Sequence, residues 1–399
     1  MDTSLPSHVS LIAEPDVWME SAAVDQLVRT AALPGCVRAV GMPDLHPGGG
    51  APIGAACLFE GRVWPHLIGS DAGCGALLVV GRRDGPRGDG LERRVVHALE
   101  EPLLPEVDRE RLFDAVWRLG PRGLAQLEGV PEALAEIGQR FEDPGGPSAP
   151  MAFDAVGAEQ LGSIGGGNHF AEVTRVDRLL DKAAAKREGL RADAQAVLVH
   201  TGSRGLGYRL AQRWSGVLTG AAIEEYLQEQ RGALRYASAN RLLVAWRLLH
   251  AAGLGNAARI TAVIDRVHNG IEPVGEGYLH RKGAAEAPAG RATLVLGSRG
   301  APSYVVEGGD GEGSLATVAH GAGRRMGRSE AVAKLRARYR RASLERTALG
   351  SRVLCDDREQ MWQEHPDAYK AIEPVIASLE KAGAARPIAT LVPLVTVKQ

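Results

Sequence analysis

The sequence predicts a mixed α/β fold in which several β-sheets are surrounded by helices. Three observations support this: short β-rich runs and helical patterns both recur along the chain, several β-rich runs end in glycine-rich loops, and the composition is globular. Of 399 residues, 45% are hydrophobic and 24% charged, so the chain can bury a sizeable core. The 50 glycines indicate many turns of special backbone geometry, where binding sites are common.

The first part of the chain is predicted to form short strands and one amphipathic helix. Strand patterns cover residues 9–13 and 37–40, and a helical pattern covers 20–32. The second strand ends in the predicted loop MPDLHPGGGAPIG, where Asp44 and His46 precede three glycines and can be aimed into a cavity. Further strands are predicted over 55–59, 63–68 and 76–80.

Asp71 and Cys74 lie in the glycine-rich sequence GSDAGCG, just past a predicted strand. Both side chains can bind a transition metal once the thiol is deprotonated, and a thiolate sulfur can bridge two ions. By itself the motif is more often a tight turn with a capping aspartate and an inert buried cysteine. The histidines that follow along the chain favour the metal site.

The middle of the chain contributes two further polar loops. Helical patterns over 91–99, 110–119 and 132–141 carry no recognisable chemistry. They are followed by GSIGGGNHFAE, in which Asn168, His169 and Glu172 come after three glycines; this is neither a P-loop nor a dinucleotide fingerprint. A strand over 197–199 then ends at His200 in HTGSRGLG, although a lone histidine is more often a core residue than a ligand.

The last part of the chain is richest in basic residues. A long helical region is predicted over 208–268, with turns near 232 and 253–255, and it closes at His268. A basic turn at HRKG precedes strands over 292–296 and 304–307, and HGAGR places His320 ahead of a basic helix over 329–349. These arginines can contact an RNA backbone or simply cover a surface. A final helix is predicted over 367–382, before PLVTVK.

Charge and cysteine content limit the classes of function. Lys and Arg total 47 against 48 Asp and Glu, so any nucleic-acid binding must come from a local basic patch. The four cysteines contain no CxxC pair, no signal peptide is recognised and no apolar run is long enough to span a bilayer. The expectation is a protein of the reducing cytoplasm that is not a membrane protein.

A resemblance rests on blocks that follow one another in order: MPDLHPGGGAPIG, a GxDxxCG block, GSIGGGNHFAE, HTGSRGLG, HRKGA, GSRGAPSYVV, HGAGR, HPDAYK and PLVTVK. With them the sequence resembles the RtcB-type RNA-splicing ligases over nearly its whole length. The variants MPDLHP and PHLIGSDAGCG most resemble the branch associated with the peptide-release-factor homologue called release factor H. The resemblance implies an RNA ligase of RNA repair or tRNA splicing. It would join 2′,3′-cyclic phosphate or 3′-phosphate ends to 5′-hydroxyl ends, using GTP and manganese.

The resemblance also implies roles for single residues. His320 matches the nucleophile that becomes covalently guanylylated, and Asp44 matches the residue that orients it. Two Mn²⁺ ions would share Cys74, with the remaining ligands being Asp71, His169, His200 and His268. Guanylate contacts would come from Asn168, Glu172, Ser298 and Lys398, with Glu172 and Lys398 near the base, and phosphate contacts, including those to the nucleotide, would come from Arg204, Arg281, Lys282 and Arg324.

Because these residues are scattered from Asp44 to Lys398 and must converge, we expect one large domain over residues 1–399 with the site in a central cleft. Arg299 stands where the family usually has a small or apolar residue, and Gln399 stands where it usually ends in glycine; both can alter nucleotide choice. The alternatives are a metal-dependent phosphoesterase that opens cyclic phosphates and a regulatory RNA-binding relative. Without the resemblance, the pattern of residues alone predicts only an enzyme that binds a metal and acts on phosphates.

Overall fold

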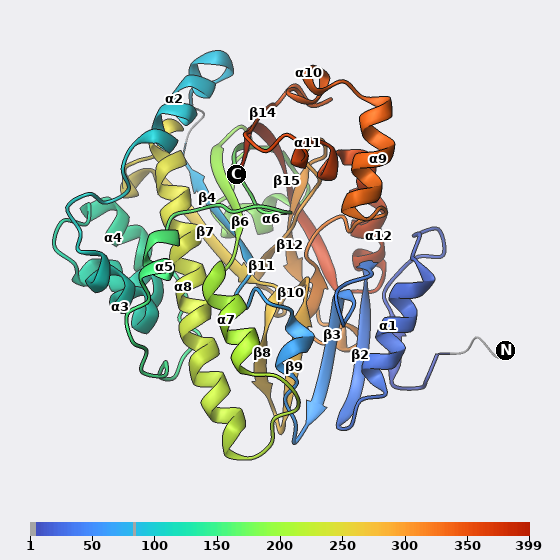
Figure 1. Cartoon of the computed structure of the whole chain (residues 1–399). Helices are drawn as coiled ribbons and strands as arrows, with labels where there is room; N and C mark the ends of the chain where they lie inside the picture. The colour runs from blue at the N-terminus through green and yellow to red at the C-terminus, as the bar shows by residue number, and fades with distance from the viewer. Residues whose placement is uncertain (1–4, 83–84) are drawn as a thin grey trace.

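The computed structural model describes residues 5–82 and 85–399, in which strands of three sheets lie between two groups of helices (Figure 1). The mixed α/β prediction is confirmed. The first sheet has five strands in the order β1-β2-β3-β9-β8, with β1 parallel to β2 and the other pairs antiparallel. Its strands are β1 (Val9–Leu11), β2 (Cys36–His46), β3 (Ile53–Glu60), β8 (Asn269–Val274) and β9 (Gly277–Lys282). Helix α1 (Ser21–Ala31) buries Ala23 and Leu27 against this sheet.

The second sheet has eight strands and holds most of the site. Its order is β11-β12-β15-β5-β6-β4-β7, with β14 pairing beside β15. The last strand in sequence therefore lies between β12 and β5 rather than at an edge. The strands are β4 (Gly75–Gly81), β5 (Phe170–Leu179), β6 (Gln195–Thr201), β7 (Ile260–Val267), β11 (Ala292–Val295), β12 (Ser303–Gly308), β14 (Arg352–Cys355) and β15 (Ala385–Lys398). A two-stranded ribbon joins β10 (Ala284–Glu286) to β13 (Thr317–Ala319).

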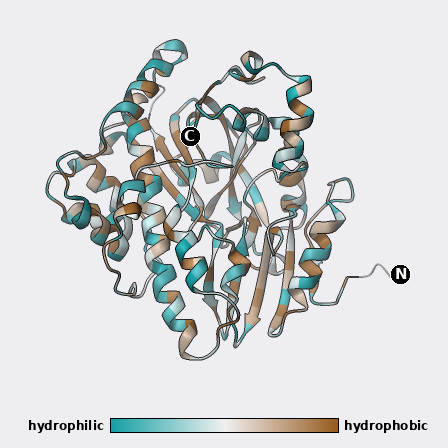
Figure 2. Ribbon diagram, viewed as in Figure 1, coloured by the Kyte–Doolittle hydropathy of each residue, from teal (hydrophilic) through white to brown (hydrophobic). Residues whose placement is uncertain are grey.

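Helices cover the sheets from both sides. On the left of Figure 1, α8 (Ala221–Ala251) packs on the eight-stranded sheet, and around it lie α2 (Gly88–Glu100), α3 (Arg109–Leu119), α4 (Glu132–Gly138) and α5 (Ala155–Gln160), with α7 (Gly205–Arg213) on its other side. On the right lie α9 (Arg328–Arg338) and α12 (Ile372–Lys381), with α11 (Gln360–Gln363) beside α9 and α10 (Arg341–Leu344) above them. Helix α6 (Lys182–Arg187) follows β5. The central strands are largely hydrophobic, whereas the outer helices show mixed faces (Figure 2).

Several predicted elements differ from the structure. Residues 63–68, predicted as a strand, contain the short 3-10 helix η1 (Pro65–Ile68), because Pro65 has no N–H for a ladder and suits a first helical turn. Met42–His46, predicted as a loop, belongs to β2. The turn predicted near Gly232 is absent, since Gly232 lies inside α8, where a Cβ would come within 2.2 Å of the Trp117 ring.

The predicted helix ending at His268 is also wrong. Residues Ile260–Val267 form β7, in which Ile260, Ala262 and Ile264 alternate toward the core with the period of a strand. The basic HRKG segment is not a solvated turn, because it completes β9 and is buried. The basic helix over 329–349 is two helices, α9 and α10, and the helix predicted over 367–382 begins only at Ile372, after the 3-10 turn η5 (Pro366–Ala368).

The remaining 3-10 segments are η2 (Gly120–Gln126), η3 (Ala257–Arg259) and η4 (Glu312–Ser314). Within the described ranges, no helix combines the length and the apolar character needed to cross a bilayer.

Candidate active site

A cluster of histidines and a cysteine gathers where neighbouring strands of the eight-stranded sheet begin or end. Cys74 directly precedes β4, His169 directly precedes β5, and His200 lies near the end of β6. Because β5, β6 and β4 are adjacent and antiparallel, these positions meet at one edge of the sheet. Sγ of Cys74 lies 3.4 Å from Nε2 of His169 and 3.5 Å from Nε2 of His200. The ligand atoms of these three residues all lie within 4.8 Å of one another, which is compatible with a bound metal ion.

Two more of the predicted ligands adjoin this cluster. Nε2 of His268, between β7 and β8, lies 3.2 Å from Nε2 of His200. Oδ2 of Asp71 lies 3.1 Å from Nε2 of His169. The structure therefore brings all five predicted metal ligands together, with the Cys74 sulfur between the His169 side and the His200 side.

The protonation of the cluster suits a metal site. Burial, reinforced by neighbouring histidines, lowers the pKa of His200 and His268 well below the ordinary value, so both imidazoles are neutral and offer lone pairs. Burial raises the pKa of the Cys74 thiol well above 9.0, and the Asp71 charge adds to the effect. A bound cation would have to replace the thiol proton. Burial opposes the charge of Asp71, but its contact with His169 keeps the pKa of the carboxyl below 3.8.

Helix α8 holds the loops that carry the ligands. Arg241 is fully buried, and its Nη1 donates to the carbonyl oxygens of Gly73 at 2.7 Å and Thr201 at 3.1 Å. The same guanidinium donates to both carboxylate oxygens of Asp265, at 2.6 Å and 2.9 Å, so its charge is paired. One arginine thus fixes the residue before Cys74 and the residue after His200.

The neighbouring Asn240 completes this support. Its Nδ2 donates to the carbonyl oxygens of Ser163 and Gly202, and its Oδ1 accepts from the N–H of Gly162. Asn240 therefore joins the loop before His169 to the loop after His200. Sequence reasoning assigned neither α8 residue to the site, because their partners are main-chain groups that a motif does not display.

His320 and Asp44 form a second polar group beside the cluster. His320 follows β13, and its Nδ1 lies 2.7 Å from Oδ2 of Asp44, which is fully buried in β2. The approach is not aligned as a conventional hydrogen bond, and among the described residues neither Asp44 oxygen has another hydrogen-bond partner. The His320 ring centroid lies 5.0 Å from that of His268. With Nδ1 turned toward Asp44, Nε2 is the nitrogen available for chemistry.

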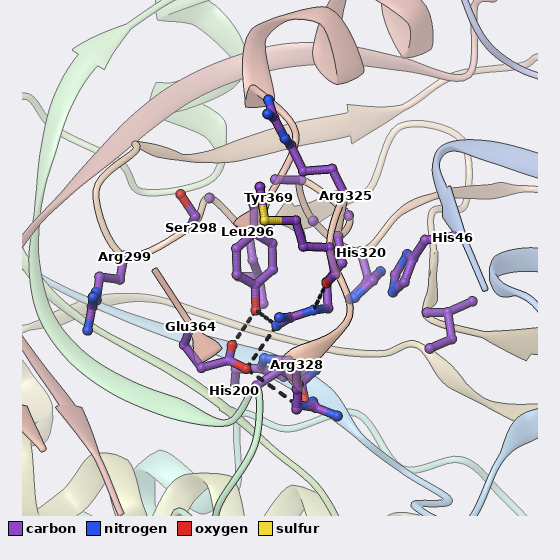
Figure 3. Close-up of a pocket in the computed structure, with 18 of the residues that line it drawn as sticks. His46, His200, Leu296, Ser298, Arg299, His320, Arg325, Arg328, Glu364 and Tyr369 are labelled. Atoms are coloured by element: carbon purple, nitrogen blue, oxygen red, sulfur yellow. Dashed lines mark hydrogen bonds and ion pairs between the residues drawn. The ribbon is translucent and has the colours of Figure 1, made fainter. Parts of the chain in front are cut away.

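His320 lines a cavity of about 630 Å³ that opens between β2, β5, β15 and the loop before α9. Figure 3 shows His320 and His200 in this pocket, with Ser298 and Arg299 on one side and His46 on the other. Every nucleotide-binding residue predicted from the sequence lines the same cavity, namely Asn168, Glu172, Ser298, His320, Arg324 and Lys398.

Glu172 and Lys398 lie on adjacent strands at the wall of this cavity. Oε1 of Glu172 accepts a hydrogen bond from Oγ1 of Thr396 at 2.7 Å, across the β5–β15 ladder. Burial raises the pKa of Glu172 to about 7, although Thr396 and Lys398 oppose the shift. Nζ of Lys398 donates to the carbonyl oxygen of His169 at 2.9 Å, and burial lowers its pKa. Lys398 thereby joins this wall of the cavity to His169 of the cluster.

The predicted phosphate-binding cations separate into two groups. Arg324 lines the cavity, and its Nη1 lies 2.9 Å from Oε1 of Glu364. Arg204 lies on the metal side, with Nη1 3.2 Å from Nδ1 of His169. By contrast, Arg281 is buried against Glu272, at 2.8 Å, and Lys282 donates to main-chain carbonyls of the GGG loop. Arg281 and Lys282 are not among the residues that line the cavity containing His320.

Arg299 lines the cavity, but its guanidinium is bound to the main chain. Its Nη2 donates to the carbonyl oxygen of Met361 at 2.7 Å, and its guanidinium lies away from His320 in Figure 3. The residue is buried, and the loss of hydration lowers its pKa. Gln399 is exposed beyond the end of β15.

Sequence reasoning missed a buried carboxylate in the cavity wall. Glu364 contacts Arg324, Arg328 and the hydroxyl of Tyr369, as the dashed lines of Figure 3 mark. Burial opposes the charge of Glu364, but the positive charge of Lys398, together with these contacts, keeps the pKa of the carboxyl below 4.5. Tyr369 belongs to the HPDAYK block, which could have directed attention to this wall, whereas Glu364 lies before the block and gave no signal.

Comparison with known proteins gives a consistent result. The family model described as tRNA-splicing ligase RtcB matches residues 26–399. The chain is 37% identical to RNA-splicing ligase RtcB2 of Escherichia coli over 409 residues, covering 99% of this chain and 96% of that protein. It is 34% identical to RNA-splicing ligase RtcB of Mycobacterium tuberculosis (94% and 100% covered) and 29% identical to tRNA-splicing ligase RtcB of Archaeoglobus fulgidus (95% and 92% covered).

Proposed function

The chain belongs to the tRNA-splicing ligase RtcB family and is an RNA ligase, and from this premise we propose that it joins RNA 2′,3′-cyclic phosphate or 3′-phosphate ends to 5′-hydroxyl ends at the expense of GTP. The observation that carries the proposal is the position of His320. One ring nitrogen lies 2.7 Å from a buried carboxylate, and the ring lines a cavity next to the Cys74 cluster. This arrangement suits a nucleotide-accepting nucleophile.

In the first step, Nε2 of His320 attacks the α-phosphorus of GTP. A nitrogen–phosphorus bond forms, the bond to the β-phosphate oxygen breaks and pyrophosphate leaves. The negative charge of Asp44 beside Nδ1 favours the tautomer that is protonated there, which leaves the Nε2 lone pair free, and it stabilises the positive charge that develops on the ring. Arg324 and Arg328, at the cavity mouth, are placed to bind the phosphates.

The later steps transfer GMP to RNA and then release it. Hydrolysis first opens a cyclic phosphate to a 3′-phosphate. An oxygen of that phosphate attacks the phosphorus held by His320, so the nitrogen–phosphorus bond breaks and the RNA end carries GMP. The 5′-hydroxyl of the second RNA then attacks the 3′-phosphorus, loses its proton and displaces GMP, which leaves a 3′,5′-phosphodiester. Each displacement needs in-line geometry.

The nucleotide would be held by the predicted residues of the cavity. Glu172 can accept from the donors on the edge of guanine, with Lys398 beside it. Asn168 and Ser298 would contact the guanylate, and Arg324 its phosphate. Glu364 holds Arg324 in place. GTP as the nucleotide rests on the family resemblance and on this pairing of an acceptor with a donor.

The residues present fit a pair of manganese ions. Cys74 would be shared, with Asp71 and His169 on one side and His200 and His268 on the other, in agreement with the contacts within the cluster. Mixed sulfur, nitrogen and oxygen ligands suit a transition metal better than magnesium. When bound, such ions supply charge neutralisation to the phosphates that meet there.

Three further expectations, on location, domain extent and functional links, complete the proposal. We place the activity in the cytoplasm, where the four cysteines, all free of disulfides, would stay reduced. We treat residues 1–399 as one domain, because the site draws on Asp44 at one end and Lys398 at the other. A functional link to release factor H and to RNA repair rests only on the sequence variants MPDLHP and PHLIGSDAGCG.

The test is incubation of the purified protein with manganese and α-labelled GTP, followed by a denaturing gel. We expect acid-labile label on the wild type, none on His320→Ala and none on Cys74→Ala. His250→Ala serves as the control, because His250 lies near the end of α8 and lines a different cavity. A wild type that stays unlabelled across metals and pH, yet opens cyclic phosphates, would replace ligation with the phosphoesterase function.

A further inference from the structure

A lysine outside the metal cluster and the nucleotide cavity binds the strand that carries Asp44. The ladder between β2 and β3 is interrupted between Gly41 and His46, so the carbonyls around Asp44 need other donors. Nζ of Lys370 donates to the carbonyl oxygen of Pro43 at 3.0 Å and to that of Leu45 at 2.9 Å. The side chain of Lys370 therefore clamps the residues on both sides of Asp44.

The intervening carbonyl, that of Asp44 itself, is also bound. Nδ1 of His46 lies 2.8 Å from this oxygen. The ring of His46 is stacked at a centroid distance of 6.4 Å from that of His320. Three consecutive carbonyls thus have side-chain partners, and Lys370 supplies two of the three contacts.

The main chain of the same lysine binds the loop that carries His320. The N–H of Lys370 donates to the carbonyl oxygen of Gly323 at 2.9 Å. Gly323 has φ of +74° and lies so close to β2 that a Cβ there would come within 2.3 Å of the Asp44 carbonyl oxygen. One residue therefore joins both chain segments of the Asp44–His320 pair, one through its side chain and the other through its backbone.

The environment of the ammonium group favours this role. Among the described residues no carboxylate forms an ion pair with Lys370, and its Nζ lies 5.9 Å from the centroid of the Trp18 ring. The group is half-buried, and its hydrogen bonds go to main-chain oxygens rather than to the cavity. Its positive charge also attracts the Asp44 carboxylate.

We propose that Lys370 is a positioning residue for the guanylylation of His320, acting through Asp44. The inference rests on the proposed function for its kinetic consequence, but the geometry it concerns can be measured independently. Without the clamp, the Pro43–Leu45 segment would lose two hydrogen bonds, and Asp44 would no longer be fixed against Nδ1 of His320. Small displacements of an orienting group reduce the rate of the step it serves more than they reduce substrate binding.

The test compares single-turnover guanylylation of the full chain with Lys370→Met and with Lys381→Met. Lys381 is the matched control because it lies on α12, and among the described residues its exposed ammonium pairs only with Glu14 at the surface. For Lys370→Met we expect the rate constant to fall about tenfold, with the labelled fraction and the KM for GTP changed less than twofold. The control should match the wild type. A rate constant for Lys370→Met within twofold of the wild type would overturn the proposal.

A double-mutant cycle separates positioning from a general loss of folded protein. In the Asp44→Asn background, Lys370→Met should lower the rate by less than twofold further, because the group it positions has already been altered. Independent, multiplicative losses would contradict action through Asp44. Lys370→Arg, which keeps two donors, should recover most of the rate. If the Met variant does not fold, Lys370→Gln takes its place in the same comparison.

A crystal structure of Lys370→Met distinguishes failure of this inference from failure of the proposed function. If the wild type accepts no label from GTP, the proposed function fails, while the distance between Oδ2 of Asp44 and Nδ1 of His320 still tests the clamp. We expect this distance to increase, or the Pro43–Leu45 segment to adopt several conformations. An unchanged, ordered pair in the variant would overturn the inference even with an active ligase.

Discussion

Oδ2 of Asp44 lies 2.7 Å from Nδ1 of His320, although the two residues are far apart in the sequence. The carboxylate is fully buried and has no hydrogen-bond partner among the described residues. A buried carboxylate without partners is costly, so its position next to an imidazole indicates that it serves the ring. The pair defines which nitrogen of His320 is free and gives the first prediction.

Asp44→Asn should lower the rate constant of His320 guanylylation by about a hundredfold, because the amide cannot stabilise the charge that develops on the ring. The measurement is single-turnover labelling with α-labelled GTP at saturating nucleotide. Asp25→Asn, on the outer helix α1, serves as the control. Equal rates for the Asp44 variant and the wild type would show that the carboxylate has only a structural role.

Cys74→Ala should abolish the gain in thermal stability that manganese gives the wild type. A ligand at a hundred times its Kd stabilises a folded protein by about 2.7 kcal/mol, and this gain disappears with the site. The measurement is the melting temperature with manganese and with chelator. Cys57→Ala, in β3, can lower the melting temperature through packing but should keep the metal-dependent gain. A full gain in the Cys74 variant would place the metal elsewhere.

GTP binding should weaken by about tenfold from pH 8 to pH 6, because burial raises the pKa of Glu172 to about 7 and only the ionised carboxylate accepts from guanine. Equilibrium titration with a fluorescent GTP analogue measures this. Glu172→Gln should bind weakly with a flat profile between these pH values, whereas Glu110→Gln, exposed on α3, should keep the slope. A slope that survives in Glu172→Gln would assign the titration to another group.

The same shift has a consequence for folding stability, with a definite sign. The pKa of Glu172 in the folded protein lies above the ordinary value of 4.5, so the folded state binds this proton more tightly than the unfolded state. The contribution of Glu172 is therefore complete below pH 4.5 and is lost as the pH rises through about 7. Between these values the wild type should lose stability relative to Glu172→Gln in denaturant unfolding. A difference that does not change with pH would contradict the assignment.

Arg241→Met should lower the free energy of unfolding by about 3–5 kcal/mol, because it leaves the Asp265 charge buried without its partner and the Gly73 and Thr201 carbonyls without a donor. Denaturant unfolding measures the change. Arg118→Met removes a surface pair with Asp114 and should cost less than about 1 kcal/mol. Similar losses in the two variants would show that Arg241 does not hold the ligand loops.

The residues of the candidate site and the helices and strands that carry them could be predicted from the sequence to different extents. His200 was predicted as a ligand from the HTGSRGLG block, and His268 from its resemblance to a family ligand at the end of a helix. The structure places both in the cluster, although the helix predicted to end at His268 is a strand. A match to a sequence motif of the family identifies the chemistry of a side chain. Whether residues 260–267 form a helix or a strand depends instead on their pairing with β4 and on the alternating burial that goes with it. The predicted helix was therefore wrong, although His268 itself lies in the cluster.

The reverse holds for the basic residues. HRKG was predicted as a turn whose cations either contact phosphates or are solvated. Instead, β9 buries Arg281 and Lys282, and Lys282 donates to the carbonyls of Gly49 and Ala51. Those carbonyls belong to residues far away in the sequence, so the residues around HRKG give no indication of these hydrogen bonds. The same reason hid Lys370, Asn240 and Arg241, whose hydrogen bonds to carbonyls hold the loops of the site.

The position of β15 between β12 and β5 imposes an order on biosynthesis. Until residues Ala385–Lys398 have left the ribosome, the eight-stranded sheet is split, β5 lacks a neighbour and Glu172 lacks both Thr396 and Lys398. A chain that lacks β15 therefore cannot bring Thr396 and Lys398 beside Glu172. Truncation before Ala385 should yield products without a partly active form.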